Sequence, residues 1–291
     1  MTTATQNLIQ MLMLDQKSHE YFLGQSQPIL GTRIFGGQLL AQSIMAAAPS
    51  TSKTLHSLHA YFLCAGDASV PVLYKTEILR DSFSFCTVQV NALQFGKRIF
   101  TAMLSYMKTE DGLNYQSPQP VYPPAVQLQT EQWHKQRIQN SLPFEHREAF
   151  MQTFNIESRP VTFSHPFQPK QEEPAYTEYL KTFEPLSENI ESGSNLHPCA
   201  LHQAIAAYYS DYNLYTAAFN PHGLSYASNK IIHASLDHAV YFHRPLRADE
   251  SMLYEMKTAI TAHARGLSYG QMWQNGYLVC STQQENLMRQ I

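Results

Sequence analysis

The sequence lacks the cysteine spacings and long apolar runs that identify several common classes of protein. Its four cysteines, Cys64, Cys86, Cys199 and Cys280, stand far apart and form no C-x-x-C pair. This spacing excludes a zinc knuckle or thioredoxin-type motif and is not typical of a disulfide framework. We therefore expect reduced thiols in a cytoplasmic protein. No apolar run approaches the roughly 20 residues that span a bilayer, so stable membrane insertion is not expected.

A strong excess of charge of one sign is also missing. The formal net charge is −3 and only 15% of the residues are charged. This balance gives no reason to expect nucleic acid or an anionic membrane as a partner. The first sixteen residues contain an apolar patch without a basic region before it, which predicts a small amphipathic helix rather than a signal peptide.

What the chain does contain is an internal repeat. Its 291 residues suggest about two domains, and the segment Leu55–Asp67 resembles Ser235–Asp249. Five residues recur 180 positions later: Tyr61, Phe62, Leu73, Tyr74 and Gly96 return as Tyr241, Phe242, Leu253, Tyr254 and Gly276. A shared offset indicates two copies of one folding unit. Chemistry is then expected where the copies differ, and no Asp or Glu lies between Glu20 and Asp67 in the first copy.

Each copy is expected to consist of one helix followed by antiparallel strands. The first copy has a helix over Phe35–Ser50 and strands over 55–63, Val70–Leu79, Phe83–Leu93 and Arg98–Met107. The second has strand-like segments at Val161–Phe167 and Ala175–Phe183, a helix that starts with Pro198, and strands over 231–243, 251–260, 267–274 and 277–289. This order predicts a curved sheet wrapped around each helix, an α+β fold with the two sheets joined edge to edge or back to back.

A proline-rich and glutamine-rich stretch separates the copies and includes a short helical segment. We expect an N-terminal unit over 1–112, a linker over 113–157, and a C-terminal unit over 158–291 that carries the chemistry.

Several segments in both copies carry a resemblance to a known family. They include FGGQLLAQ (Phe35–Gln42), HSLHAYFLCAGD (His56–Asp67), YYSDYNL (Tyr208–Leu214), SLDHAVYFHRP (Ser235–Pro245) and STQQENLMR (Ser281–Arg289). The chain resembles the acyl-CoA thioesterase II family. The resemblance implies a double hotdog fold, hydrolysis of fatty acyl-CoA to free fatty acid and CoA by an activated water, no metal or other cofactor, and a homodimer or tetramer.

The resemblance also implies site residues. In the family an Asp, a Thr or Ser, and a Gln hold the hydrolytic water, and these positions fall on Asp211, Ser235 and Gln284. A carboxylate can accept the proton of the water while neutral side chains fix its orientation.

Four further residues are expected to contact the substrate. Gly36 and Gly37 begin a helix, where free backbone N–H groups suit a carbonyl oxygen or a phosphate. The alternative for these glycines is that close helix packing requires them. Arg244 and Arg265 lie in segments that match the family and are expected to bind the substrate.

A second hypothesis is a non-catalytic protein that binds acyl-CoA or an acyl carrier with the same fold. Cys64 and Gln89 stand where the family usually has Arg, which favours this alternative. The intact set of Asp, Ser and Gln favours the enzyme.

Two other patterns are set aside. Gly266–Gly270 spells G-x-S-x-G, but a nucleophile elbow precedes a helix and then an acid and a His, whereas a strand is expected here and no Asp or His follows. His238 and His243 are expected to fix their strand and its turn rather than take part in the reaction.

Overall fold

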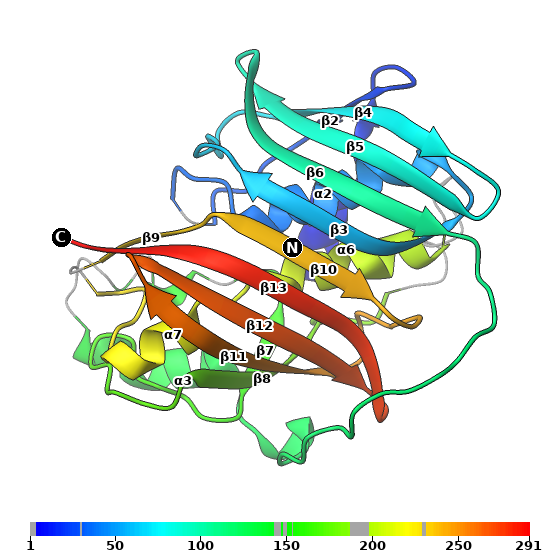
Figure 1. The fold of residues 1–291 in the computed structure, drawn as a ribbon. Coiled ribbons are helices and arrows are strands. Elements are labelled where there is room, and N and C mark those ends of the chain that lie inside the picture. Colours follow the sequence, from blue (N-terminus) through cyan, green and yellow to red (C-terminus); the bar gives the residue numbers. More distant parts are fainter. Residues whose placement is uncertain are drawn as a thin grey trace.

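Within the described residues, thirteen strands form one sheet with two central helices on its inner side (Figure 1). The computed structural model describes residues 4–29, 31–142, 147, 150–152, 154–186, 198–228 and 231–291. The strand order is β1-β2-β4-β5-β6-β3-β10-β13-β12-β11-β8-β7, with β9 paired to β13. The two halves therefore join edge to edge through β3 and β10, which confirms one of the two expected arrangements.

The element bounds follow the repeat. The first half contains α1 (Ala4–Leu12), β1 (Asp15–Gln16), β2 (Tyr21–Gly24), α2 (Gly36–Ala47), η1 (Ala48–Ser50), β3 (Thr54–Phe62), β4 (Val72–Asp81), β5 (Phe85–Gln94) and β6 (Lys97–Met107). Three short elements lie between the halves: η2 (Ala125–Gln127), α3 (Glu131–Ile138) and η3 (Gln139–Ser141). The second half contains β7 (Glu157–Pro160), β8 (Ala175–Lys181), α6 (Pro198–Ser210), α7 (Thr216–Phe219), η4 (Asn220–His222), β9 (Ile231–Ser235), β10 (Asp237–Phe242), β11 (Met252–Ala262), β12 (Arg265–Gln274) and β13 (Tyr277–Gln290).

The two halves repeat one another in their turns. Gly96 and Gly276 have φ angles of 72° and 83°, and the residue before each also has a positive φ, as a two-residue hairpin turn requires. The Gln94 side chain accepts from the backbone N–H of Asp67 and donates to its carbonyl oxygen. The Gln274 side chain makes the same pair of bonds to Arg247, 180 positions later. These turns and bonds support two copies of one unit, as the sequence predicted.

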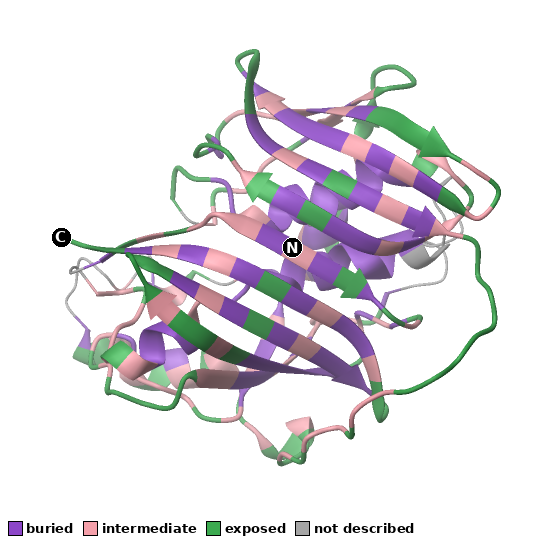
Figure 2. Cartoon of the chain, viewed as in Figure 1, coloured by how far each residue is buried: buried purple, intermediate pink, exposed green. Residues whose placement is uncertain are grey.

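The helices α2 and α6 pack against one another behind the sheet (Figure 1). Figure 2 shows buried residues alternating with exposed ones along the strands, as expected for a sheet with one covered face. The core joins both halves, since Leu40 and Ile44 of α2 belong to the same buried cluster as Ile205 of α6. The amphipathic helix expected at the amino end is α1, whose Leu8 and Leu12 enter this core.

One expected strand is wrong. The segment 161–167 forms bends and turns. The strands that pair with β8 are β11 on one edge and β7, over Glu157–Pro160, on the other. Pro166 has no backbone N–H to offer a neighbouring strand, which accounts for the difference.

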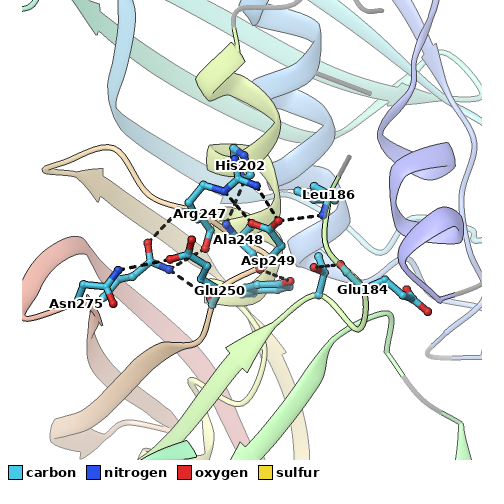
Figure 3. A network of polar contacts seen from close by, with 11 residues as sticks. Glu184, Leu186, His202, Arg247, Ala248, Asp249, Glu250 and Asn275 are labelled. Atoms are coloured by element: carbon cyan, nitrogen blue, oxygen red, sulfur yellow. Dashed lines mark hydrogen bonds and ion pairs between the residues drawn. The ribbon is translucent and has the colours of Figure 1, made fainter. Parts of the chain in front are cut away.

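A polar network fixes the start of α6 (Figure 3). The backbone N–H of Ala248 donates to Nδ1 of His202 at 3.1 Å. The Asp249 carboxylate pairs with Arg247 at 2.8 Å and accepts from the backbone N–H of Leu186 at 2.9 Å. These contacts anchor the first turns of α6 to the β10–β11 connection, and the opposite end of α6 carries the candidate site.

Candidate active site

Asp211 directly follows α6 and is buried. Its exposed fraction is 5%, so it is not the solvated residue that its place at a helix end would suggest. Beyond the helix, Asn213 adopts a left-handed conformation with φ of 61°, and its amide donates to both carboxylate oxygens of Glu178 at 3.3 Å. This turn holds Asp211 against the other half of the molecule.

The start of α2 meets Asp211. A Cβ on Gly36 would lie 2.6 Å from Oδ2 of Asp211, and a Cβ on Gly37 would lie 2.5 Å from the carbonyl oxygen of Tyr208. Only glycine permits so close an approach. The backbone N–H of Gly37 lies near the Asp211 carboxylate and acts to lower its pKa. Close packing therefore accounts for both glycines, and the N–H of Gly37 acts on Asp211. Contact of Gly36 and Gly37 with the substrate stays a prediction.

Asp211, Ser235 and Gln284, which lie far apart in the sequence, form one chain of hydrogen bonds. The Ser235 hydroxyl donates to Oδ1 of Asp211 at 2.9 Å. The Gln284 amide donates to the Ser235 hydroxyl at 3.1 Å. Gln284 is fully buried and lies on the inner face of β13. The structure thus brings together the three residues that the resemblance singled out.

A β-bulge at Leu236 makes this contact possible. Ser235 pairs with Asn286 and Ala239 pairs with Gln283, so four steps along β9 and β10 oppose three along β13. The extra residue reverses the alternation of side chains. Ser235 and His238 are three residues apart, so a regular strand would place their side chains on opposite faces. Because of the bulge both lie on the inner side of the sheet, where Ser235 contacts Asp211 and His238 is buried.

His238 holds the amide of Gln284. Its Nδ1 is hydrogen bonded to Oε1 of Gln284, and its Nε2 is 2.8 Å from the hydroxyl of Ser210 at the end of α6. Burial lowers the pKa of His238 to about 4, so the ring is neutral at pH 7. A neutral ring that donates from Nδ1 fixes Gln284 with its N–H groups toward Ser235. The sequence predicted a role in the strand for this histidine and missed its contact with Gln284.

Burial also sets the charge of Asp211. Loss of solvent raises its pKa from the ordinary value of 3.8 to about 7, against the opposing effect of the Ser235 hydroxyl and the Gly37 N–H. The Gln284 amide opposes the rise as well. A carboxylate with a pKa near neutrality suits a general base, because it is ionised yet basic enough to accept a proton from water.

The two arginines expected to bind the substrate, Arg244 and Arg265, lie outside the Asp211 cluster. Arg244 follows β10, donates to Asn114 of the linker at 2.9 Å and lies over the ring of Tyr277. Arg265 pairs with Glu285 at 2.8 Å on the outer face of the sheet, opposite to Gln284. Neither contacts the Asp211 cluster in this structure, and their role in substrate binding stays a prediction.

Two kinds of feature are absent from the residues that the structure describes. No group of three or more His, Cys, Asp or Glu side chains there could hold a metal ion. No helix in that part of the chain is long and apolar enough to cross a membrane.

Comparisons with known proteins cover both halves of the chain. A family model described as acyl-CoA thioesterase matches residues 146–287, and a model of the acyl-CoA thioesterase N-terminal domain matches residues 25–107. Human acyl-coenzyme A thioesterase 8 is 33% identical over 288 residues, which cover 96% of this chain and 87% of that protein. Acyl-CoA thioesterase 2 of Haemophilus influenzae is 30% identical over 293 residues, which cover 99% of each chain. The crystal structure of an acyl-CoA thioesterase II from Mycobacterium marinum has a TM-score of 0.74 at 28% identity and covers 98% of both chains.

Proposed function

The chain belongs to the acyl-CoA thioesterase family, and on this premise we propose that it hydrolyses fatty acyl-CoA to free fatty acid and CoA with Asp211 as the general base. The observation that carries the proposal is the hydrogen-bonded chain that joins the buried Asp211 and Gln284 through the half-buried Ser235. Its carboxylate has a pKa of about 7, the range in which a general base works best. The double hotdog fold implied by the family resemblance agrees with the observed sheet and its two central helices.

In the proposed reaction a water donates a hydrogen bond to Asp211. As its oxygen attacks the thioester carbonyl carbon, one proton passes to the carboxylate and an oxyanion forms on the carbonyl oxygen. Collapse of this intermediate breaks the carbon–sulfur bond, and the thiolate of CoA leaves with the proton that Asp211 had accepted. No covalent enzyme intermediate is needed, because the thiolate is a good leaving group.

We also propose a metabolic role, a cellular compartment and a division of the chain into two units. We infer a role in fatty acid metabolism in the cytoplasm, and the free thiols of Cys64, Cys86 and Cys280 are compatible with that compartment. The units over 1–112 and 158–291, joined by the linker 113–157, would each supply one central helix. No nucleic acid partner is proposed.

We further propose a homodimer or tetramer. The outer face of the sheet exposes large apolar side chains, among them Tyr61, Met103 and Tyr269, which a second copy would cover. Sedimentation at micromolar concentration tests this, and a monomer there would contradict it.

A thiol-release assay with acyl-CoA substrates of short, medium and long chain tests the function. We expect CoA release from at least one chain length. Binding of every substrate without release would instead identify a protein that only holds acyl-CoA.

A further inference from the structure

Asn286 has a buried amide group without a partner. Its residue is 2% exposed, and its Oδ1 accepts from Nε2 of Gln284 at 2.7 Å. Its Nδ2 is buried and has no hydrogen-bond partner among the described residues. Leaving such a donor unpaired costs about 1–3 kcal/mol. A buried donor without a partner requires an explanation, and beside the Asp211 cluster one explanation is a ligand that accepts its hydrogen bond.

The other side-chain donors of the cluster are already used. Gln284 has two N–H groups, which donate to Ser235 and to Asn286. The Ser235 hydroxyl has one hydrogen, which it donates to Asp211. Among Ser235, Gln284 and Asn286, only Nδ2 of Asn286 therefore remains free to donate to a substrate.

The repeat provides a second, independent observation. Ser235 of β9 pairs with Asn286 of β13, and 180 positions earlier Leu55 of β3 pairs with Tyr106 of β6. Each pair stands next to a shift in strand register, so the two pairs are equivalent in the repeat. The pair His238 and Gln284 likewise takes the place of Leu58 and Leu104, which are neighbours across β3 and β6. Three positions that are leucine in the first half are thus polar in the second, and the fourth changes from tyrosine to asparagine. Asn286 belongs to the same substituted set as Ser235, His238 and Gln284.

We propose that Asn286 is a further catalytic residue, whose Nδ2–H donates to the carbonyl oxygen of the thioester as that oxygen becomes an oxyanion. This inference rests on the proposed hydrolysis. The proton from the attacking water passes to Asp211, the electron pair of the carbonyl moves onto oxygen, and Asn286 stabilises that charge without giving up its proton. A preorganised donor of this kind contributes about 10²–10³-fold to turnover.

Two substitutions separate donation to substrate from support of Gln284. Asn286→Asp keeps an acceptor for the Gln284 amide and removes the donor. Asn286→Leu removes both groups at similar size. We expect each variant to lose about 10²-fold in kcat with KM within a few fold, measured above pH 8.5 so that ionisation of Asp211 is near its limit. If the kcat of Asn286→Asp stays within threefold of the wild-type value, the proposal is overturned. The side chain of Asn286 would then serve only to accept the hydrogen bond from Gln284.

A matched control and a spectroscopic measurement complete the test. Asn91→Ala alters a buried strand amide in the first half, whose Oδ1 accepts from Thr101 at 2.9 Å, and should leave kcat unchanged. In an Asp211→Asn background, the carbonyl stretch of a bound thioester should move to lower frequency than in water, and Asn286→Leu should abolish this shift. An unchanged stretch on adding Asn286→Leu would overturn the proposal even if the single variants fold poorly. Absence of wild-type turnover would instead count against the proposed hydrolysis itself.

Discussion

Replacing Asp211 by Asn should weaken catalysis and strengthen the fold at the same time. The carboxylate is 5% exposed and its pKa is raised to about 7 by burial. The native state therefore binds more protons than the unfolded chain between pH 3.8 and pH 7, and the free energy of unfolding falls as the pH rises through this window. The raised pKa corresponds to a cost on the order of 4 kcal/mol at pH 8, and about 2–3 kcal/mol of it develops between pH 5 and pH 8. An amide carries none of this cost.

Two assays on one variant check this reasoning. In thiol release, Asp211→Asn should lose about 10²-fold or more in turnover, the usual scale for loss of a general base. In urea unfolding, its stability relative to the wild type should increase from pH 5 to pH 8. Asp67→Asn serves as the control, because hydrogen bonds from Ser69 lower the pKa of Asp67, so its removal should not stabilise the fold as the pH rises. If Asp211→Asn keeps the wild-type turnover, the water-activation scheme is wrong. If the stability difference between Asp211→Asn and the wild type does not change with pH, Asp211 does not carry the buried charge described above.

Other substitutions test the rest of the site. Gln284→Ala should lower turnover by about tenfold or more with the fold retained, and Ser235→Ala should cost less, because water can partly replace a hydroxyl; equal losses in kinetic assays would contradict this order. Gly36→Ala places a methyl group 2.6 Å from the Asp211 carboxylate, so we expect it to abolish activity and lower the melting temperature. A fully active variant would show that α2 and α6 can move apart readily. Ser268→Ala removes the hydroxyl of the G-x-S-x-G string, and its kcat should stay within a few fold of wild type; a loss as large as that of Asp211→Asn would reopen the question of a serine nucleophile.

The sequence predicted the fold well because local signals agreed with one another. The 180-residue offset placed both hairpin turns, and both copies of the turn have positive φ at two successive residues. Gln284 alternates along β13 with the buried Thr282 and Asn286, which places all three on the inner face. The strand expected after Gly270 is continuous with β12, which explains why the G-x-S-x-G string has no helix behind it.

The geometry of the site depended on features that periodicity does not show. The bulge at Leu236 changes which side of the sheet the side chains occupy. Strict alternation through Leu236 would place Ser235 on the face opposite to Gln284, whereas in the structure the two side chains are hydrogen bonded. The contact of His238 with Gln284 crosses 46 positions of sequence. Arg244 and Arg265 were assigned from their segments alone, and the direction of an exposed side chain follows from tertiary neighbours such as Asn114 and Glu285.

The position of Asp211 explains why the site needs both halves. A carboxylate at the end of α6 is disfavoured by the dipole of its own helix, by a few tenths to about 1 kcal/mol. The start of α2 opposes this effect, because its positive end and the N–H of Gly37 face the same carboxylate. The first half therefore contributes a helix end and two glycines, while the second contributes the proposed base and the side chains around it. Neither half by itself contains a complete set, so the proposed chemistry depends on the edge-to-edge joining of β3 and β10.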